Sequence, residues 1–262
     1  MEPASLIGMI LVLIGIFLGS LMKGVSPVSL VAVPAALLIV IVASVGATAM
    51  ANNMSDFKNI GKIMGKGFKK QKIDDPNESI DRIVHLAERA RREGLLALEE
   101  EVGKVDDPFL QRGLQLAIDG GDPEMVREVM ETELGAMHQR HKIGADMMTT
   151  LGIFSPTFGI IGAVIGLIAT LSHLDEPEKL GYGIAAAFVA TFWGVFMANG
   201  IFLPLGKKLG RMSAEEIASK QLVIEGVLSI QAGANPRVLD DMLSSYLPPK
   251  VRAARQEEKK SA

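Results

Sequence analysis

The chain has 262 residues, of which 48% are hydrophobic, and its 27 basic and 30 acidic residues leave a net charge of −3. This near balance gives no general attraction to nucleic acid, and the absence of cysteine excludes disulfides and thiolate metal sites. The charges are unevenly distributed. Four windows contain no Asp, Glu, Lys or Arg: Ala4–Met22, Gly24–Ser55, Met147–Ser172 and Leu180–Gly206.

Each window reaches or nearly reaches the length that a helix needs to cross a bilayer. About 20 apolar residues suffice, and the windows hold 19, 32, 26 and 27 residues. The first window is not expected to be a cleaved signal peptide, because it lacks a basic leader and the second window follows after Lys23 alone. The sequence therefore predicts an all-α membrane protein with four transmembrane helices.

Basic residues near the ends of the windows predict the orientation of these helices. The two short connections hold only Lys23 and Lys179, whereas the 20-residue stretches 56–75, 127–146 and 207–226 hold six, three and four Lys and Arg residues, thirteen in all. Because cytoplasmic loops retain positive charge, we expect both short hairpins outside and both termini in the cytoplasm. The predicted domains are a transmembrane hairpin (1–55), a cytoplasmic helical domain inserted between helices 2 and 3 (56–146), a second transmembrane hairpin (147–206) and cytoplasmic C-terminal helices with a disordered tail (207–262).

Two stripes follow the second window at helical spacing. The apolar stripe consists of Phe57, Ile60, Met64 and Phe68, and the basic stripe of Lys58, Lys62 and Lys66. An interfacial helix, with its lysines at anionic lipid, has this pattern. A solvated, lysine-rich linker is the alternative.

Helix boundaries can be placed in the charged segments. Asp107-Pro108, Asp122-Pro123 and Asn235-Pro236 each put a capping side chain before a proline at the first helical position. The helix that begins near Pro123 is expected to run straight into the third window. Ser213 and Glu216 have the spacing of a capping box that opens a new helix, and Pro248-Pro249 is expected to end the ordered chain.

The predicted membrane helices contain no ionisable side chain. Such groups mark ion paths within membranes, so a proton relay along carboxylates of this chain is unavailable. Small residues such as Gly162 and Gly166 are expected to pack the helices closely. Pro156 and Pro204 indicate kinks that could act as hinges, although Pro204 could instead end its helix. Trp193 lies in the middle of its window and is expected to pack against protein.

No pattern in the sequence indicates an enzyme. The chain lacks a nucleophile–base arrangement, a P-loop and a dinucleotide fingerprint. His138, His141 and Glu133 are spaced closely enough to suggest a metal site, but they belong to a highly charged, solvated helix. We therefore predict no catalytic residue, no metal and no cofactor.

Three motifs resemble those of the MotA/PomA flagellar stator proteins, and the similarity extends over essentially the whole chain. They are Ala90-Arg91-Arg92-Glu93-Gly94-Leu95-Leu96-Ala97-Leu98-Glu99, Pro156-Thr157-Phe158-Gly159-Ile160-Ile161-Gly162-Ala163-Val164-Ile165-Gly166 and Ala190-Thr191-Phe192-Trp193-Gly194-Val195-Phe196-Met197-Ala198-Asn199. Their order and their positions relative to the predicted helices are those of the family.

The resemblance implies a stator subunit in the bacterial cell membrane, at the flagellar basal body. Five copies would surround two copies of a MotB-like partner, whose transmembrane Asp carries the ion, and the ring would drive the flagellar rotor through its switch protein. An ExbB/TolQ-like proton-driven energiser is the nearest alternative, and a passive membrane scaffold is another.

The resemblance also implies roles for individual residues. Thr191 matches the family's pore threonine, and Ala163 stands where sodium-driven relatives have threonine, which favours H⁺ over Na⁺ as the transported ion. Pro156 and Pro204 match prolines that couple ion passage to conformational change. The residues that match charged rotor contacts are Arg91, Arg92 and Glu99. A threonine that only packs between helices and a solvated charged face remain the alternatives for these sites.

Overall fold

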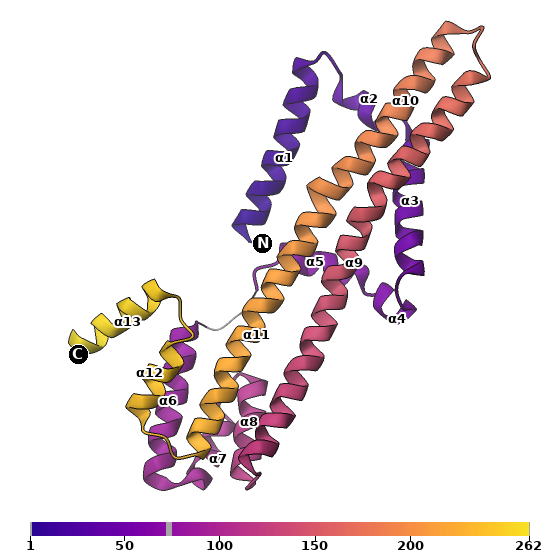
Figure 1. Ribbon diagram of the computed structural model, residues 1–262. Coiled ribbons are helices and arrows are strands. Elements are labelled where there is room, and N and C mark those ends of the chain that lie inside the picture. The colour runs from indigo at the N-terminus through magenta and orange to yellow at the C-terminus, as the bar shows by residue number, and fades with distance from the viewer. Residues whose placement is uncertain (1, 72–74, 262) are drawn as a thin grey trace. The chain divides into compact units, whose positions relative to one another are not determined.

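The structure is a computed structural model that describes residues 2–71 and 75–261, and side chains as far as residue 257. Every element in these ranges is helical (Figure 1). The elements are α1 (Pro3–Met22), α2 (Pro27–Val31), α3 (Pro34–Met50), α4 (Met54–Phe57), α5 (Ile60–Phe68), α6 (Pro76–Glu93), a 3-10 turn (Leu95–Leu98), α7 (Glu99–Val102), α8 (Pro108–Ile118), α9 (Pro123–Leu171), α10 (Pro177–Phe196), a π-helical segment (Met197–Phe202), α11 (Leu203–Gln231), α12 (Pro236–Ser244) and α13 (Pro249–Ser261).

The chain divides into two compact units. One comprises residues 1–70 and 141–211, and the other comprises residues 71–140 and 212–262. We call them the apolar unit and the charged unit. Helices α9 and α11 contribute residues to both, and α5 with its lysines belongs to the apolar unit.

Three helices of the described chain are long and apolar enough to cross a membrane: α1, α9 and the continuous run from Pro177 to Gln231 that includes α10 and α11. The second charge-free window is not one helix but two, because the chain breaks before Pro34. Val33 has φ −116° and ψ 80°, a non-helical backbone, and a residue before proline disfavours the helical region. After the break, α3 is an apolar helix of 17 residues.

Small residues let α9 and α10 pack backbone to backbone (Figure 1). A Cβ added to Gly194 would lie 2.6 Å from the carbonyl oxygen of Ser155, and one added to Gly159 would lie 3.0 Å from that of Ala190. Gly162 and Gly166 make the same kind of contact with Ala190 and Ala187. The predicted role of the glycines in helix packing is confirmed for these positions.

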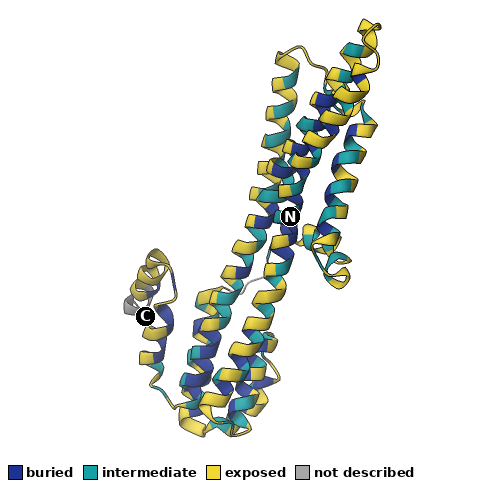
Figure 2. Ribbon diagram, turned by 45° about the vertical axis from the view of Figure 1, so that its right-hand side comes forward, coloured by how far each residue is buried: buried dark blue, intermediate teal, exposed yellow. Residues whose placement is uncertain are grey.

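The helices that are long enough to cross a membrane expose large apolar side chains, whereas the charged unit has a buried core (Figure 2). Helix α1 contains no buried residue at all. The core of the charged unit is built by α6, α8, α12 and the parts of α9 and α11 within that unit, and its fully buried members include Ile80, Ile83, Leu114, Val126, Met130 and Leu243. Burial of such side chains stabilises a helical domain by roughly 1.5–3 kcal/mol each.

The predicted helix starts are confirmed where the capping signal is local. Asp107 Oδ1 accepts from the amide of Phe109 at 3.0 Å, and Asn235 Oδ1 accepts from that of Arg237 at 3.0 Å. Helix α9 begins at Pro123 and continues into the third window, as predicted.

Two predictions for the C-terminal part are wrong. Ser213 does not open a helix, because it lies inside α11 and its hydroxyl is buried. The segment after Pro248 is not disordered, because Pro249–Ser261 forms α13. Within α13, the buried Arg255 donates to Asp81 at 2.5 Å and to Asp240 at 2.6 Å. A buried ion pair holds this charged helix, and its composition alone gave no sign of that contact.

Candidate functional site

The candidate ion-path residue Thr191 lies on α10, next to the tight contact with α9. Its side chain is half-buried, and its hydroxyl donates to the carbonyl of Ala187 at 3.3 Å. That bond uses the hydroxyl proton, so the oxygen lone pairs remain available to accept from another group. The hydroxyl of Thr191 therefore bonds its own helix, as a packing threonine does, and its oxygen can still accept a hydrogen bond, as a role in the ion path requires.

Thr191 lines a groove of about 480 Å³ between α1 and α10. The other lining residues are Val12, Ile16, Phe188, Phe192, Val195, Phe196, Asn199 and Gly200. Nearly all of this lining is apolar, and Thr191 and Asn199 supply its polar side chains. Asn199 is exposed, and its amide donates to the carbonyl of Val195 at 3.1 Å. The groove holds no titratable group that could itself carry a proton.

The structure does not bring Ala163 and Thr191 to one cavity. Ala163 is half-buried on α9, one residue after the Gly162 that contacts Ala190, and it does not line the groove of Thr191. A methyl group offers no oxygen to a desolvated sodium ion. The preference for H⁺ over Na⁺ stays a prediction, because Ala163 and Thr191 do not line the same groove.

Pro156 and Pro204 lie in different kinds of backbone. Pro156 lies within the continuous helix α9, and a Cβ on Gly194 would lie 3.1 Å from its Cα atom. Pro204 does not end its helix, so that interpretation is wrong: α11 continues to Gln231. The π-helical segment Met197–Phe202 ends two residues before Pro204. A widened turn gives room to a proline ring that crowds the preceding helical turn.

The candidate rotor residues lie at the exposed end of α6 and just after it. Arg91, Arg92 and Glu99 are all exposed, and among the described residues none of them forms an ion pair. Gly94, at φ +85°, ends α6 and turns the chain toward Glu99. A positive φ of this size favours glycine. The structure thus presents two cations and an anion without internal partners.

Arg89 and Glu101 hold this turn, and the sequence analysis missed both. Arg89 donates to Glu93 at 3.1 Å and to Glu101 at 2.5 Å, and Lys104 donates to Glu101 at 2.9 Å. The hydrogen bond from Lys104 is the main cause that lowers the pKa of Glu101 below its usual range. The hydrogen bond to Glu93 is the main cause that raises the pKa of Arg89. The i,i+4 spacing of Arg89 and Glu93 and the i,i+3 spacing of Glu101 and Lys104 are signals that the sequence offers, whereas the contact between Arg89 and Glu101 has no such signal.

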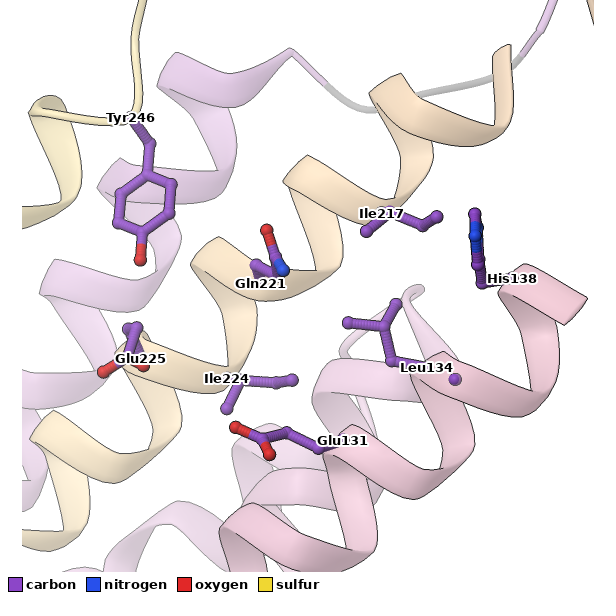
Figure 3. A pocket seen from close by; sticks show the side chains of 9 residues that line it. Glu131, Leu134, His138, Ile217, Gln221, Ile224, Glu225 and Tyr246 are labelled. Carbon is purple, nitrogen blue, oxygen red and sulfur yellow. The ribbon is translucent and has the colours of Figure 1, made fainter. Parts of the chain in front are cut away.

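The charged unit has one further concave region, of about 620 Å³, between α9 and α11 (Figure 3). Leu134, Ile217 and Ile224 form its apolar part, and Glu225 is held by Arg127 at 2.8 Å. His138 and Tyr246 also line it. The lining residues include no Ser, Thr, Cys or Lys nucleophile, and no group of three metal-ligating side chains occurs among the described residues.

The comparisons with known proteins identify the family. Residues 6–94 match the Motility protein A N-terminal family, and residues 101–221 match the MotA/TolQ/ExbB proton channel family. The chain is 43% identical over 252 residues to Motility protein A of Bacillus subtilis, covering 96% of this chain and 93% of that protein. The chain belongs to the MotA family.

Other relatives and solved structures agree with this assignment. The MotA-family chain is 36% identical to the Chemotaxis protein PomA of Vibrio alginolyticus, with coverage of 83% and 85%. The flagellar MotAB stator complex from Bacillus subtilis matches with a TM-score of 0.91 and 42% identity, covering 97% of this chain and 99% of that chain. The C. jejuni MotAB structure matches with a TM-score of 0.90 and 30% identity, covering 95% and 97%. These relatives are motor and channel proteins rather than enzymes.

Proposed function

We propose that this chain is a flagellar motor stator subunit that, with a MotB-like partner, couples proton flow across the cell membrane to rotor torque. The observation that carries the proposal is the fold match to MotAB stator complexes over nearly the whole chain. The match of residues 6–94 to the Motility protein A N-terminal family favours a stator over an ExbB/TolQ-like energiser.

The proposed topology has four membrane crossings. Helices α1, α9 and the run through α10 have the necessary length, and α2 with α3 would make the fourth crossing. Residues Pro27–Met50 would span about 36 Å if helical throughout, against the roughly 30 Å of a hydrocarbon core, and the break before Pro34 shortens this length. The proposed cytoplasmic parts are residues 56–146 and 207–262, with both termini on that side and the subunit in the bacterial inner membrane.

The partner's carboxylate is the proposed ion carrier. The charge-free windows of this chain offer no carboxylate, so a MotB-like helix bearing an Asp would supply it, within a five-fold ring around a partner dimer. Thr191 would accept a hydrogen bond from the protonated Asp, since its hydroxyl oxygen has free lone pairs. Ala163 would exclude Na⁺, because its methyl group cannot ligate a metal ion.

The torque-transmitting parts are also proposals. Pro156, and Pro204 with the π-helical segment before it, would allow α9 and α11 to move as the partner's Asp gains and loses its proton. Arg91, Arg92 and Glu99 would contact oppositely charged groups of the rotor switch protein, which their exposure and lack of internal ion pairs permit.

Coexpression with the MotB-like partner tests this function. The purified complex, with the partner's plug region removed, is expected to carry H⁺ into liposomes, as followed with a pH-sensitive dye. Thr191→Ala should lower the flux, whereas Thr150→Ala, at an exposed hydroxyl that also bonds its own helix at 2.8 Å, serves as the matched control. A passive scaffold would give no flux with any partner. A strict requirement for Na⁺ would refute the role of Ala163, and gated H⁺ transport by this chain alone would refute the role of the partner.

A further inference from the structure

Three lysines in and just before α5 have no ion-pair partner within the described chain. Lys58, Lys62 and Lys66 are exposed and form no ion pair with any described residue. Asp56 is the only acidic residue in the segment from Met54 to Lys70. Spacings of four residues place the three lysines on one side of α5 and the turn before it. We call this set the lysine face.

The opposite side of α5 is covered by protein, which differs from the pattern of a free interfacial helix. Phe57, Ile60, Ile63 and Phe68 pack against the buried cluster of Met147, Met148, Leu151 and Leu205. Of the predicted apolar stripe, Met64 alone does not join this cluster and is exposed, and Ile63 takes its place. The apolar side of α5 is therefore not available for insertion into lipid.

Close contacts fix α5 in this position. A Cβ added to Gly144 would lie 3.3 Å from Ile63 Cγ2, and one added to Gly67 would lie 2.8 Å from Leu205 Cδ2. The backbone amide of Glu2 donates to the carbonyl of Phe68 at 3.3 Å, and Glu2 also pairs with Lys208. Helix α5 is thus attached to α1, α9 and α11 at once.

The packing also places the lysine face at the charged ends of the apolar helices. The residues that cover α5 are the first of one charge-free window, Met147 and Met148, and almost the last of another, Leu205. In a bilayer these window ends lie at the level of the lipid headgroups. Phosphate-bearing headgroups are therefore the nearest anions that three unpaired lysines would meet.

We propose that the lysine face is a binding surface for anionic phospholipid headgroups, which it holds by charge alone while the apolar side of α5 stays packed on α9 and α11. The proposal rests on the membrane placement in the proposed function. Because α5 is fixed to three helices, bound lipid would set the depth of the apolar unit next to Pro204. Each lysine close to an anionic surface contributes attraction that corresponds to roughly five-fold in affinity.

The test measures lipid binding to the full chain in complex with its partner. Phosphatidylglycerol and phosphatidylcholine are titrated onto the complex in mild detergent, and bound lipids are counted by native mass spectrometry. Preference for phosphatidylglycerol is expected, and Lys58→Gln/Lys62→Gln/Lys66→Gln should reduce it by roughly ten- to a hundred-fold. Arg237→Gln/Lys250→Gln/Arg252→Gln is the matched control, because it removes the same charge from exposed residues of the charged unit.

Two further measurements, a phosphate competition and a disulfide-locked variant, separate a lipid site from a free-anion site and from insertion of α5 into lipid. Inorganic phosphate at the lipid concentration should not compete, and competition would show a free-anion site instead of a lipid site. An Ile63→Cys/Gly144→Cys pair, unique in a chain without cysteine, would lock α5 onto α9, and lipid preference should survive this disulfide. Loss of preference in the locked form, or equal losses in the two triple variants, would overturn the proposal. Proton flux in liposomes is read separately, so failure of lipid binding does not imply failure of the stator function.

Discussion

Trp193 satisfies a backbone carbonyl that a proline leaves without a donor. In an unbroken helix the amide of residue 34 would bond the carbonyl of Leu30, but Pro34 has no N–H. The indole Nε1 of Trp193 donates to that carbonyl at 2.6 Å, across 163 residues of sequence. Trp193→Phe keeps an aromatic ring and removes this donor.

The expected cost of Trp193→Phe follows from the environment of the carbonyl. An unsatisfied buried group costs about 1–3 kcal/mol, and hydrogen bonds measured within membrane proteins average nearer 0.6 kcal/mol, reaching about 1.7. Trp193 is half-buried and also contacts Phe192 and Phe196. We therefore expect Trp193→Phe to lower the free energy of unfolding by about 1–2 kcal/mol.

A double-mutant cycle isolates the hydrogen bond from the loss of ring area. Pro34→Ala restores an amide that can bond Leu30 within its own helix, so Trp193→Phe should cost about 1 kcal/mol less in that background. Unfolding in detergent, followed by far-ultraviolet circular dichroism, measures all four proteins. Equal costs of Trp193→Phe in the two backgrounds would refute the assignment of Trp193 as the partner of the orphaned carbonyl.

Three other predictions concern the packing of each unit. Arg255→Ala should remove the cation that pairs with the buried Asp240, cost about 2 kcal/mol and expose α13 to trypsin, and an unchanged cleavage rate would contradict the role of Arg255. Glu101→Gln should destabilise the full chain at neutral pH and much less near pH 3. A lowered carboxyl pKa gives stability that is present above the unfolded pKa of about 4.3 and lost as pH falls through the folded value, so a constant difference between variant and parent would contradict it. Gly194→Ala should cost about 1–3 kcal/mol by forcing α9 and α10 apart, whereas Gly181→Ala, with nothing within 4 Å of the added Cβ, should be neutral or stabilising by up to about 1 kcal/mol when both are measured by unfolding in detergent.

Local signals in the sequence predicted local structure well. The capping side chains of Asp107 and Asn235 act on amides two residues away, so they are visible in a short stretch of sequence. The prediction for Ser213 failed because a capping pattern inside a long helix has no effect when tertiary packing continues the helix through it. The prediction of disorder after Pro248 failed for a related reason, because Arg255 bonds Asp81, which lies 174 residues away in the sequence.

The candidate site likewise has features that the sequence could predict and features that only the structure shows. The absence of Asp, Glu, Lys and Arg in the apolar windows and the kinks at the two prolines were evident from the sequence, and the resemblance to stator proteins supplied the roles of Thr191 and Ala163. The structure added the hydrogen bonds and the groove lining, which neither composition nor the resemblance could give. Thr191 bonds its own helix while it faces the groove with Asn199, and Ala163 does not share that groove. The turn that presents Arg91 is held by Arg89 and Glu101, whose contact depends on how the chain folds back after Gly94.

Two prolines of the apolar helices lie in different backbone surroundings, from which we expect different mechanical behaviour. At Pro34 the freed carbonyl of Leu30 is held by a side chain from another helix, so movement there must break a contact between α2 and α10. Before Pro204 the helix widens into a π-helical segment without interrupting the run from Pro177 to Gln231. A change between π-helical and α-helical turns would shift hydrogen bonds by one residue within the same helix, without separating two helices. The first proline therefore favours a fixed bend, whereas the second favours a site where α10 and α11 can change their relative rotation.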